Sequence, residues 1–450
     1  TDDGFDFSVM SEFRQRLLVH DAEARLLEIM LASFQERKLL SARGKQRTDS
    51  THILAHVREL NRLEFVGETL RAALNEVATV ATAWLKALAP PEWFDRYSRP
   101  FSAYRLPQKE AERLALGEQI GRDGLYLLTQ IYAPTSAPEL RQLEPVEVLR
   151  RVWVQQFYSD DDQTRWRKPG NTPPGERLLT SPYDADARLS KKRDTTWVGY
   201  KVHLTETCDD DRPHLITHVE TTLATTADND SVAPIHAELA RKACLPALHL
   251  VDAGYTSGKA VAEGRAQYQL ALLGPMRANP GWQARSAQGF DLSGFHIDFQ
   301  QRTVTCPQGH TTTHWCERPG TRGKPAVQAK FPVTICRACP VRARCTTAKK
   351  GRQVTFMPEP EFSALQAARQ REQTDAFKET YKKRAGVEGT ISQAVGVLGM
   401  RRTRYRSLDR VHLQHVMTAA AMNLMRVLDW LGGKHPATTR TSAFARLAAA

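Results

Sequence analysis

Three side chains near the carboxyl end of the sequence have types and spacing that suit phosphodiester chemistry. Tyr381, Arg384 and Glu388 recur at i, i+3 and i+7, which places them on one face of a predicted helix. A guanidinium can grip a phosphate at two points, an aromatic ring can lie against a sugar or base, and a carboxylate can hold a metal ion. One carboxylate alone holds Mg²⁺ poorly, so this helix predicts partner carboxylates elsewhere in the chain.

Asp252 is one candidate partner. It follows a short apolar strand predicted at 247–251 and opens the glycine turn Asp-Ala-Gly-Tyr. In an α/β sheet, ligands gather at the carboxyl ends of the strands, where Asp252 is expected to lie. The alternative is a turn aspartate that bonds its own backbone, just as Glu388 alone would be typical of a solvated helix surface.

Asp49 is a second candidate, within the stretch Lys-Gln-Arg-Thr-Asp-Ser-Thr-His-Ile-Leu at 45–54. This stretch has two interpretations: a strand that exposes Asp49, or an N-cap for a helical pattern at 53–60. The residues by themselves favour the cap, because Asp, Ser and Thr satisfy the first free N–H groups of a helix.

A basic run follows the predicted helix. It contains four arginines, Arg401, Arg402, Arg404 and Arg406, with Tyr405 between them. Arginine without lysine favours bidentate contacts to anions, and such a run could follow a phosphate backbone. A charge run is also typical of a merely solvated face.

Cysteines provide the strongest local spacing signal. Four of the seven in the chain, Cys306, Cys336, Cys339 and Cys345, are predicted to form one tetrahedral structural zinc site. His310 and Cys316 are possible substitutes, and the gap between Cys339 and Cys345 is wider than usual. The alternative is a set of scattered reduced cysteines. A closed four-thiolate site would stabilise its surroundings without hydrolysing anything.

Composition bounds the class of protein. The chain has 450 residues, of which 41% are hydrophobic and 25% charged, so it is long and apolar enough for several globular domains. A formal charge of +13 favours a polyanionic partner, although a soluble basic protein would show it too. The longest apolar run, 416–431, contains Asn423, Arg426 and Asp429, which indicates an amphipathic core helix and no membrane span.

The elements that must position these residues follow an α/β order. Helices are predicted in 7–40 and 55–157, with a loop-like stretch at 159–186. A half-buried strand at 197–204 and a second strand at 215–223 are expected to form an antiparallel hairpin. Further elements are predicted as a helix from Ser231, strands at 247–251 and 270–273 around a helix at 257–268, a β-rich stretch at 290–356, and helices from Glu361 and at 407–430.

Taken together, the sequence resembles the DDE-type transposases of bacterial insertion sequences. The resemblance covers roughly residues 7–431 and is carried by four motifs: Thr48-Asp-Ser-Thr51, Val251-Asp-Ala-Gly-Tyr255, Tyr381-x₂-Arg-x₃-Glu388, and Ser181-Pro-Tyr-Asp-Ala-Asp-Ala-Arg188 running into Gly199-Tyr-Lys-Val202. It implies an α/β fold with an RNase H-like mixed sheet flanked by helices, an all-α insertion and a β-rich zinc-ribbon-like insertion. It also implies Asp49, Asp252 and Glu388 as catalytic carboxylates, with Asp184 as the alternative first carboxylate and Asp186 after it.

The resemblance implies a domain division along the chain. The expected parts are an amino-terminal helical segment, truncated at its start (1–44), the first core strand (45–54), a helical insertion (55–183), the core (184–289), a Cys-rich β insertion (290–356), helices carrying the catalytic Glu (357–431) and a flexible tail (432–450).

The implied function is two-metal-ion cleavage and joining of phosphodiester bonds at the ends of an insertion sequence. The resemblance implies Mg²⁺ or Mn²⁺ at the carboxylates, structural Zn²⁺, double-stranded DNA as partner, a homodimer or higher oligomer on that DNA, and a place in the bacterial cytoplasm with the nucleoid. Tyr381, Arg384 and the four arginines of 401–406 would contact the DNA.

Two features depart from the family pattern. Val395 stands where a lysine is expected, and the usual helical DNA-binding region does not precede Thr1. The alternatives are therefore an inactive remnant that acts only as a zinc-containing DNA-binding protein, and a metal-dependent nuclease without strand transfer.

Overall fold

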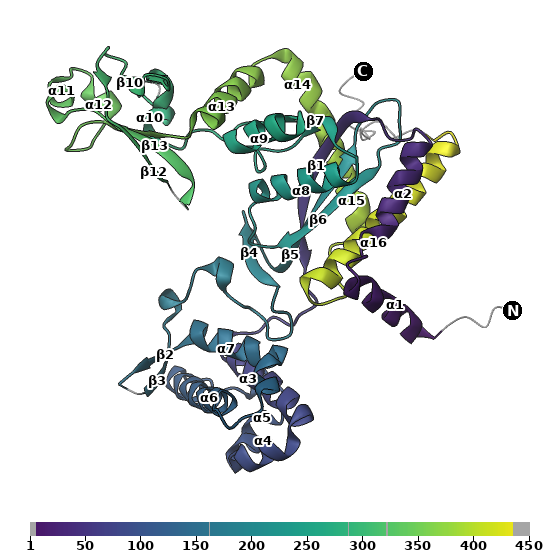
Figure 1. Ribbon diagram of the computed structural model, residues 1–450. Coiled ribbons are helices and arrows are strands. Elements are labelled where there is room, and N and C mark those ends of the chain that lie inside the picture. Colours follow the sequence, from purple (N-terminus) through teal and green to yellow (C-terminus); the bar gives the residue numbers. More distant parts are fainter. Residues whose placement is uncertain (1–5, 162, 287, 321–322, 435–450) are drawn as a thin grey trace, which may run out of the picture.

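A six-stranded mixed sheet forms the centre of the protein. The computed structural model describes residues 6–161, 163–286, 288–320 and 323–434 (Figure 1). The strand order is β4-β5-β1-β7-β8, and β6 pairs with β5 on the edge opposite β1, along the part of β5 that follows its pairing with β4. β5 runs antiparallel to β1, β4 and β6, whereas β7 runs parallel to β1 and β8. The strands are β1 (Arg43–Leu54), β4 (Arg188–Lys192), β5 (Thr195–Thr207), β6 (Ile216–Leu223), β7 (Pro246–Leu250) and β8 (Ala271–Leu273).

The stretch around Asp49 is a strand, so its interpretation as a helix N-cap was wrong. Ile53 pairs with Tyr200 on β5, and the apolar residues that suggested a helical pattern instead extend β1 into the core. The next helix, α3 (Arg62–Val80), begins later at its own capping box. There Asn61 Oδ1 accepts from the amides of Leu63 and Glu64, each at 3.1 Å.

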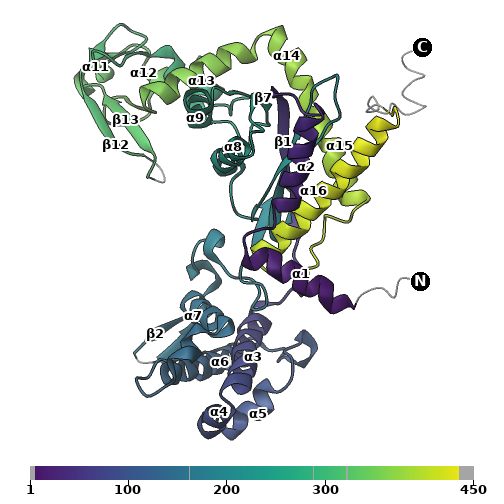
Figure 2. The same ribbon diagram turned by 45° about the vertical axis from the view of Figure 1, so that its right-hand side comes forward.

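Helices cover both faces of the sheet (Figure 2). On one side lie α8 (Val232–Arg241) and α9 (Gly258–Tyr268), and on the other α2 (Arg25–Glu36), α15 (Gly386–Gly396) and α16 (Leu408–Leu431). β5 was predicted to be half-buried, but His203 on its second face has no exposed surface because that face is covered as well. The structure thus confirms a mixed α/β fold. In the described residues no helix is both long and apolar enough to cross a membrane.

Residues between β1 and β4 form a helical block with its own hydrophobic core (Figure 1). Its helices after α3 are α4 (Thr82–Leu88), α5 (Pro91–Tyr97), α6 (Glu110–Ile131) and α7 (Glu144–Gln156). The stretch expected to be a loop at 159–186 begins with a hairpin instead, because β2 (Phe157–Asp160) pairs with β3 (Gln163–Trp166). At the amino terminus, α1 (Phe7–Val19) and α2 are the two predicted helices.

The Cys-rich stretch is β-rich, as predicted. β9 (His296–Asp298), β10 (Thr303–Thr305) and β11 (Thr311–Thr312) form one three-stranded sheet, and β12 (Trp315–Pro319), β13 (Pro325–Lys330) and β14 (Gln353–Phe356) form another. Short helices α10 (Trp282–Arg285), α11 (Val333–Ala338) and α12 (Arg342–Cys345) accompany them. We call residues 290–356 the Cys-rich module. Its boundaries, like those of the other predicted domains, stay predictions.

The helix predicted through Tyr381, Arg384 and Glu388 is interrupted. After α13 (Glu359–Glu372), α14 (Asp375–Lys382) ends in a 3₁₀ turn at Lys383–Ala385, and α15 starts at Gly386. The single regular helical face was therefore a wrong expectation, since a 3₁₀ turn rotates more per residue than an α-helix. The tail predicted to be flexible lies, from residue 435 on, outside the described residues.

Candidate active site

One guanidinium contacts all three of the predicted carboxylates. Arg384 Nη2 lies 2.6 Å from Asp49 Oδ2 and 3.9 Å from Asp252 Oδ2, and Arg384 Nη1 lies 2.8 Å from Glu388 Oε1. The three carboxylates come from β1, from the turn after β7 and from α15, and Arg384 lies in the 3₁₀ turn before α15. The fold therefore brings together side chains from distant parts of the sequence, since Asp49 and Arg384 are 335 positions apart.

The three carboxylates differ in exposure. The side chain of Asp49 is 13% exposed, that of Asp252 34% and that of Glu388 64%. Asp49 is therefore buried, whereas Glu388 lies at the surface. Burial raises the pKa of Asp49, although Arg384 acts in the opposite direction. Asp252 also accepts the amide of Gly254 at 2.6 Å, the local turn bond foreseen as its alternative role.

The alternative first carboxylates lie in structural positions. Asp184 is 3% exposed and accepts the hydroxyl of Tyr200 at 2.5 Å. Asp186 accepts the amide of Leu408 at 3.0 Å, at the start of α16. Among the described residues, Asp184 and Asp186 form no ion pair with Arg384, whereas Asp49 does.

The predicted DNA-contact residues have mixed environments. Tyr381 stacks on Phe377, with ring centroids 5.4 Å apart, and is packed against the end of the sheet. Arg401 donates to Thr51 Oγ1 at 2.8 Å and to the carbonyl of His52, which anchors it to β1. Arg402 and Arg404 are exposed.

Arg406, also exposed, lies over the ring of Tyr183, 5.4 Å from its centroid. Arg401 is therefore bonded to β1, whereas the other three arginines present charge at the surface.

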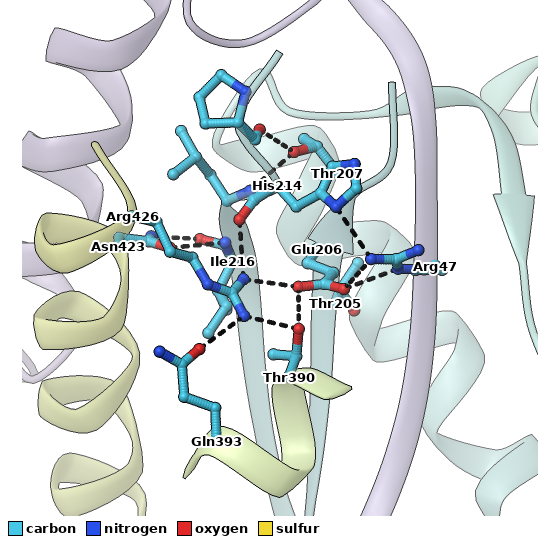
Figure 3. Close-up of polar contacts among 12 residues, drawn as sticks. Arg47, Thr205, Glu206, Thr207, His214, Ile216, Thr390, Gln393, Asn423 and Arg426 are labelled. Atoms are coloured by element: carbon cyan, nitrogen blue, oxygen red, sulfur yellow. Dashed lines mark hydrogen bonds and ion pairs between the residues drawn. The ribbon is translucent and has the colours of Figure 1, made fainter. Parts of the chain in front are cut away.

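A buried ionic network links β1, β5, α15 and α16, and the sequence analysis missed it (Figure 3). Glu206, with no exposed surface, accepts Arg47 Nε and Arg426 Nη1, each at 2.7 Å, and the hydroxyl of Thr390 at 2.5 Å. Arg47 also donates to the carbonyl of Lys383 at 2.6 Å. We call Arg47, Glu206, Thr390 and Arg426 the Glu206 clasp.

The clasp ties the strand of Asp49 to the helix of Glu388. Arg47 is two residues before Asp49 on β1, and Thr390 is two residues after Glu388 on α15. Burial acts to raise the pKa of Glu206, but Arg426 and Arg47 outweigh burial, so that its pKa is lowered and the group is ionised. Alternation along β1 could have flagged Arg47, because an arginine at an inward position needs a buried partner.

A fourth carboxylate, Asp228, flanks the same turn as Asp252. A Cβ on Gly254 would lie 2.8 Å from Asp252 Oδ1 and 3.0 Å from Asp228 Oδ2. Lys201 Nζ neutralises Asp228 at 2.8 Å. The sequence showed Asp228 only as part of a helix start, and no local signal pointed to its position beside Asp252.

The four predicted zinc ligands lie in one region of the Cys-rich module. Cys306, Cys336 and Cys345 all pack against its small apolar core. The pKa of the Cys345 thiol is raised by burial and further by the proximity of Cys336, Cys306 and Cys339. Within the part of the chain that the structure describes, however, no three His, Cys, Asp or Glu side chains form a group arranged to hold a metal ion.

The same holds for Asp49, Asp252 and Glu388, which in the described residues surround the guanidinium of Arg384 without forming a group arranged to hold a metal ion. Residues 305–428 match the family model described as a transposase DDE domain. The matched segment contains Arg384 and Glu388 but neither Asp49 nor Asp252. The match confirms the resemblance to DDE-type insertion-sequence transposases and supports a transposase-type function, which implies DNA binding. No curated protein matches the chain.

Proposed function

We propose that this protein is a DNA transposase that cleaves and joins phosphodiester bonds at insertion-sequence ends. The observation that carries the proposal is the contact of one guanidinium, that of Arg384, with Asp49, Asp252 and Glu388. Like charges gather in a folded protein when a cation or a reaction requires them, since their mutual repulsion otherwise destabilises the fold. The match to a transposase DDE domain supports the same reaction class.

Asp49, Asp252 and Glu388 are the residues that would hold Mg²⁺ or Mn²⁺. Carboxylate oxygens are the preferred ligands of such ions, and these three already balance one cation, the guanidinium of Arg384, although as they lie they form no metal-binding group in the described residues. Bound there, the two ions would activate the attacking water or 3′-hydroxyl and stabilise the leaving oxygen.

Residues of the chain itself supply positioning. Arg384 balances the charge of the carboxylates and is close enough to them to grip a phosphate of the scissile strand. The ring of Tyr381 is held by its stack on Phe377 and would contact a sugar or base of the same strand. Arg402, Arg404 and Arg406 add sequence-independent attraction to the DNA backbone.

The wider proposal follows the family resemblance. The central sheet would be an RNase H-like core, with 55–183 and 290–356 as insertions into it. The protein would act as a dimer or higher oligomer on double-stranded DNA, in the bacterial cytoplasm. Zinc would be held by Cys306, Cys336, Cys339 and Cys345, and this fits their common location and their thiol chemistry.

The zinc proposal has a direct test. Purified protein is expected to contain about one zinc per chain by elemental analysis, as a four-thiolate site requires. Cys339→Ser should lower that content, whereas Cys316→Ser should not, because Cys316 is exposed and lies outside the set. Equal zinc content in both variants would contradict the assignment.

The catalytic proposal is tested with substitutions that remove one charge each. Asp49→Asn, Asp252→Asn and Glu388→Gln should each abolish Mg²⁺-dependent cleavage of DNA carrying the element's ends. Asp375→Asn, at a side chain 93% exposed on α14, is the matched control and should cleave normally. Normal cleavage by the three site variants would refute the metal-site assignment.

The joining step separates this proposal from its two rivals. A precut end supplied with target DNA should yield joined products with the unaltered chain. Cut products without joined ones would favour a nuclease that lacks strand transfer. DNA binding without any cleavage would favour an inactive remnant.

A further inference from the structure

A cleft of about 800 Å³ lies between the central sheet and the Cys-rich module. Its walls come from the turn after β7, the start of α9, the middle of α13 and strand β14. We call it the module groove and define it by Thr256, Arg277, Lys324, Arg352, Gln353 and Arg369. Its volume lies within the range of small-molecule pockets, but it is open at the surface, which suits an extended partner better than an enclosed ligand.

One end of the module groove adjoins the carboxylate cluster. Arg277, which lines the groove, donates from Nε to the carbonyl of Ala253 at 3.0 Å and from Nη2 to that of Gly254 at 3.1 Å. These are the two residues that follow Asp252. A chain lying in the groove would therefore lead directly to Asp252.

Charges in the module groove favour an anion. Four cationic side chains line it, those of Arg277, Lys324, Arg352 and Arg369, against two acidic ones, Asp230 and Asp291. Asp291 is already engaged, since it accepts from Asn279 at 3.2 Å and from the amide of Ser293 at 3.0 Å. The net charge of the lining is therefore positive.

Two further features point to an anionic partner. The guanidinium of Arg352 lies over the ring of Phe295, 5.6 Å from its centroid, and its buried Nε has no hydrogen-bond partner among the described residues, although such groups are normally paired. The start of α9 also faces the groove through Ser257 and Gly258, and helix N-termini attract negative charge.

We propose that the module groove binds the sugar–phosphate backbone of the DNA strand that enters the site at Asp252. This deepens the proposed function and rests on it for the identity of the strand. The Cys-rich module would then be the second wall of the DNA path, in addition to any structural role of its cysteines. Lys324 and Arg369 would each contact one phosphate.

The test compares two double variants with the same loss of charge. Lys324→Gln with Arg369→Gln removes two groove cations. Arg16→Gln with Lys434→Gln removes one arginine and one lysine elsewhere, both 77% exposed. Binding of a fluorescent 30-base-pair duplex would be measured by anisotropy over a range of KCl concentrations without added Mg²⁺ or Mn²⁺, which keeps the measurement independent of cleavage and leaves structural zinc in place.

The groove variant should lower the slope of log affinity against log salt by about 1.8, because each phosphate contact contributes about 0.9. The control should leave the slope within error of the unaltered chain. A photoreactive benzoylphenylalanine at position 324 should also cross-link to the duplex, and one at position 434 should not.

Equal slopes for the two double variants, or no cross-link from position 324, would overturn the groove proposal even if the chain cleaves DNA. Stronger competition by polyglutamate than by DNA would also overturn it, since the groove would then suit an acidic protein. A changed slope in a chain that never cleaves would retain the groove and refute the transposase activity. The two proposals can thus fail separately.

Discussion

Glu206→Gln is expected to loosen the connection between β1 and α15 while preserving the shape of the side chain. The substitution leaves Arg47 and Arg426 without their buried counter-charge, and their side chains are only 7% and 17% exposed. Removal of one partner from a buried ion pair costs about 3–5 kcal/mol. Because the glutamine amide can still accept a hydrogen bond, we expect the lower end, about 3 kcal/mol.

Amide hydrogen exchange measures the loss of stability in the central sheet itself, independently of the hydrophobic cores of the helical block and the Cys-rich module. Amides of β1 and β5 should exchange about 10²-fold faster in Glu206→Gln, which corresponds to about 3 kcal/mol of local stability. Glu317→Gln, at a side chain 68% exposed and paired with Arg302, is the matched control and should change stability by less than about 0.5 kcal/mol. Exchange in Glu206→Gln as slow as in this control would refute the assigned role.

The effect of Glu206 should also depend on pH. Its pKa is lowered in the folded protein, so its contribution is present above the ordinary glutamate pKa and is lost as the pH falls through the lowered value. The difference in exchange between Glu206→Gln and the unaltered chain should therefore shrink in acid. A difference that grows in acid would contradict an ionised, paired Glu206.

Three further predictions concern the same region. Gly386→Ala should reduce DNA cleavage, because a Cβ there would collide with the guanidinium of Arg47; Gly389→Ala, where a Cβ meets nothing within 4 Å, is its control and should cleave normally. Arg384→Gln should raise the pKa of Asp49 further, because Arg384 now lowers it, and should move the acid limb of the cleavage–pH profile to higher pH. Burial lowers the pKa of His415 to about 3, so the folded state loses stability as the pH falls below the unfolded value near 6.5, by about 2 kcal/mol between pH 6.5 and 5. Hydrogen exchange of α16 should show that loss, and His415→Gln should remove it.

Regular elements of the core could be predicted because their patterns are local. Alternation in β5, the strand–Asp–Gly order around Asp252 and the helical spacing in α8 and α9 all depend on neighbours in sequence. The strand containing Asp49 was different. Its own residues favoured a helix cap, and only the family resemblance indicated a strand, because pairing with β5 and β7 is a long-range contact that propensity does not record.

The missed parts of the site depend on tertiary packing. Lys383 lies in the 3₁₀ turn before α15, and its carbonyl accepts a hydrogen bond from Arg47. These two residues are 336 positions apart in sequence. Likewise, nothing in the sequence around Glu206 indicates that its carboxylate pairs with Arg426. Buried polar partners are chosen by the fold as a whole, so single-sequence patterns cannot pair them.

The same ion-pair chemistry serves two purposes in this site, and the exposure of the acidic partners distinguishes them. Glu206 has no exposed surface, so removal of a partner would leave buried charge uncompensated. Arg384 is itself 14% exposed and pairs with Asp49, which is 13% exposed, but its contacts with Asp252 and Glu388 lie at partly exposed positions, where water can replace the guanidinium at little cost. The Glu206 clasp can therefore keep β1 and α15 in place while Arg384 changes partners between Asp252 and Glu388. Arg384→Gln, which removes the cation beside Asp49 on β1, should therefore speed the exchange of β1 and β5 amides, but less than Glu206→Gln does.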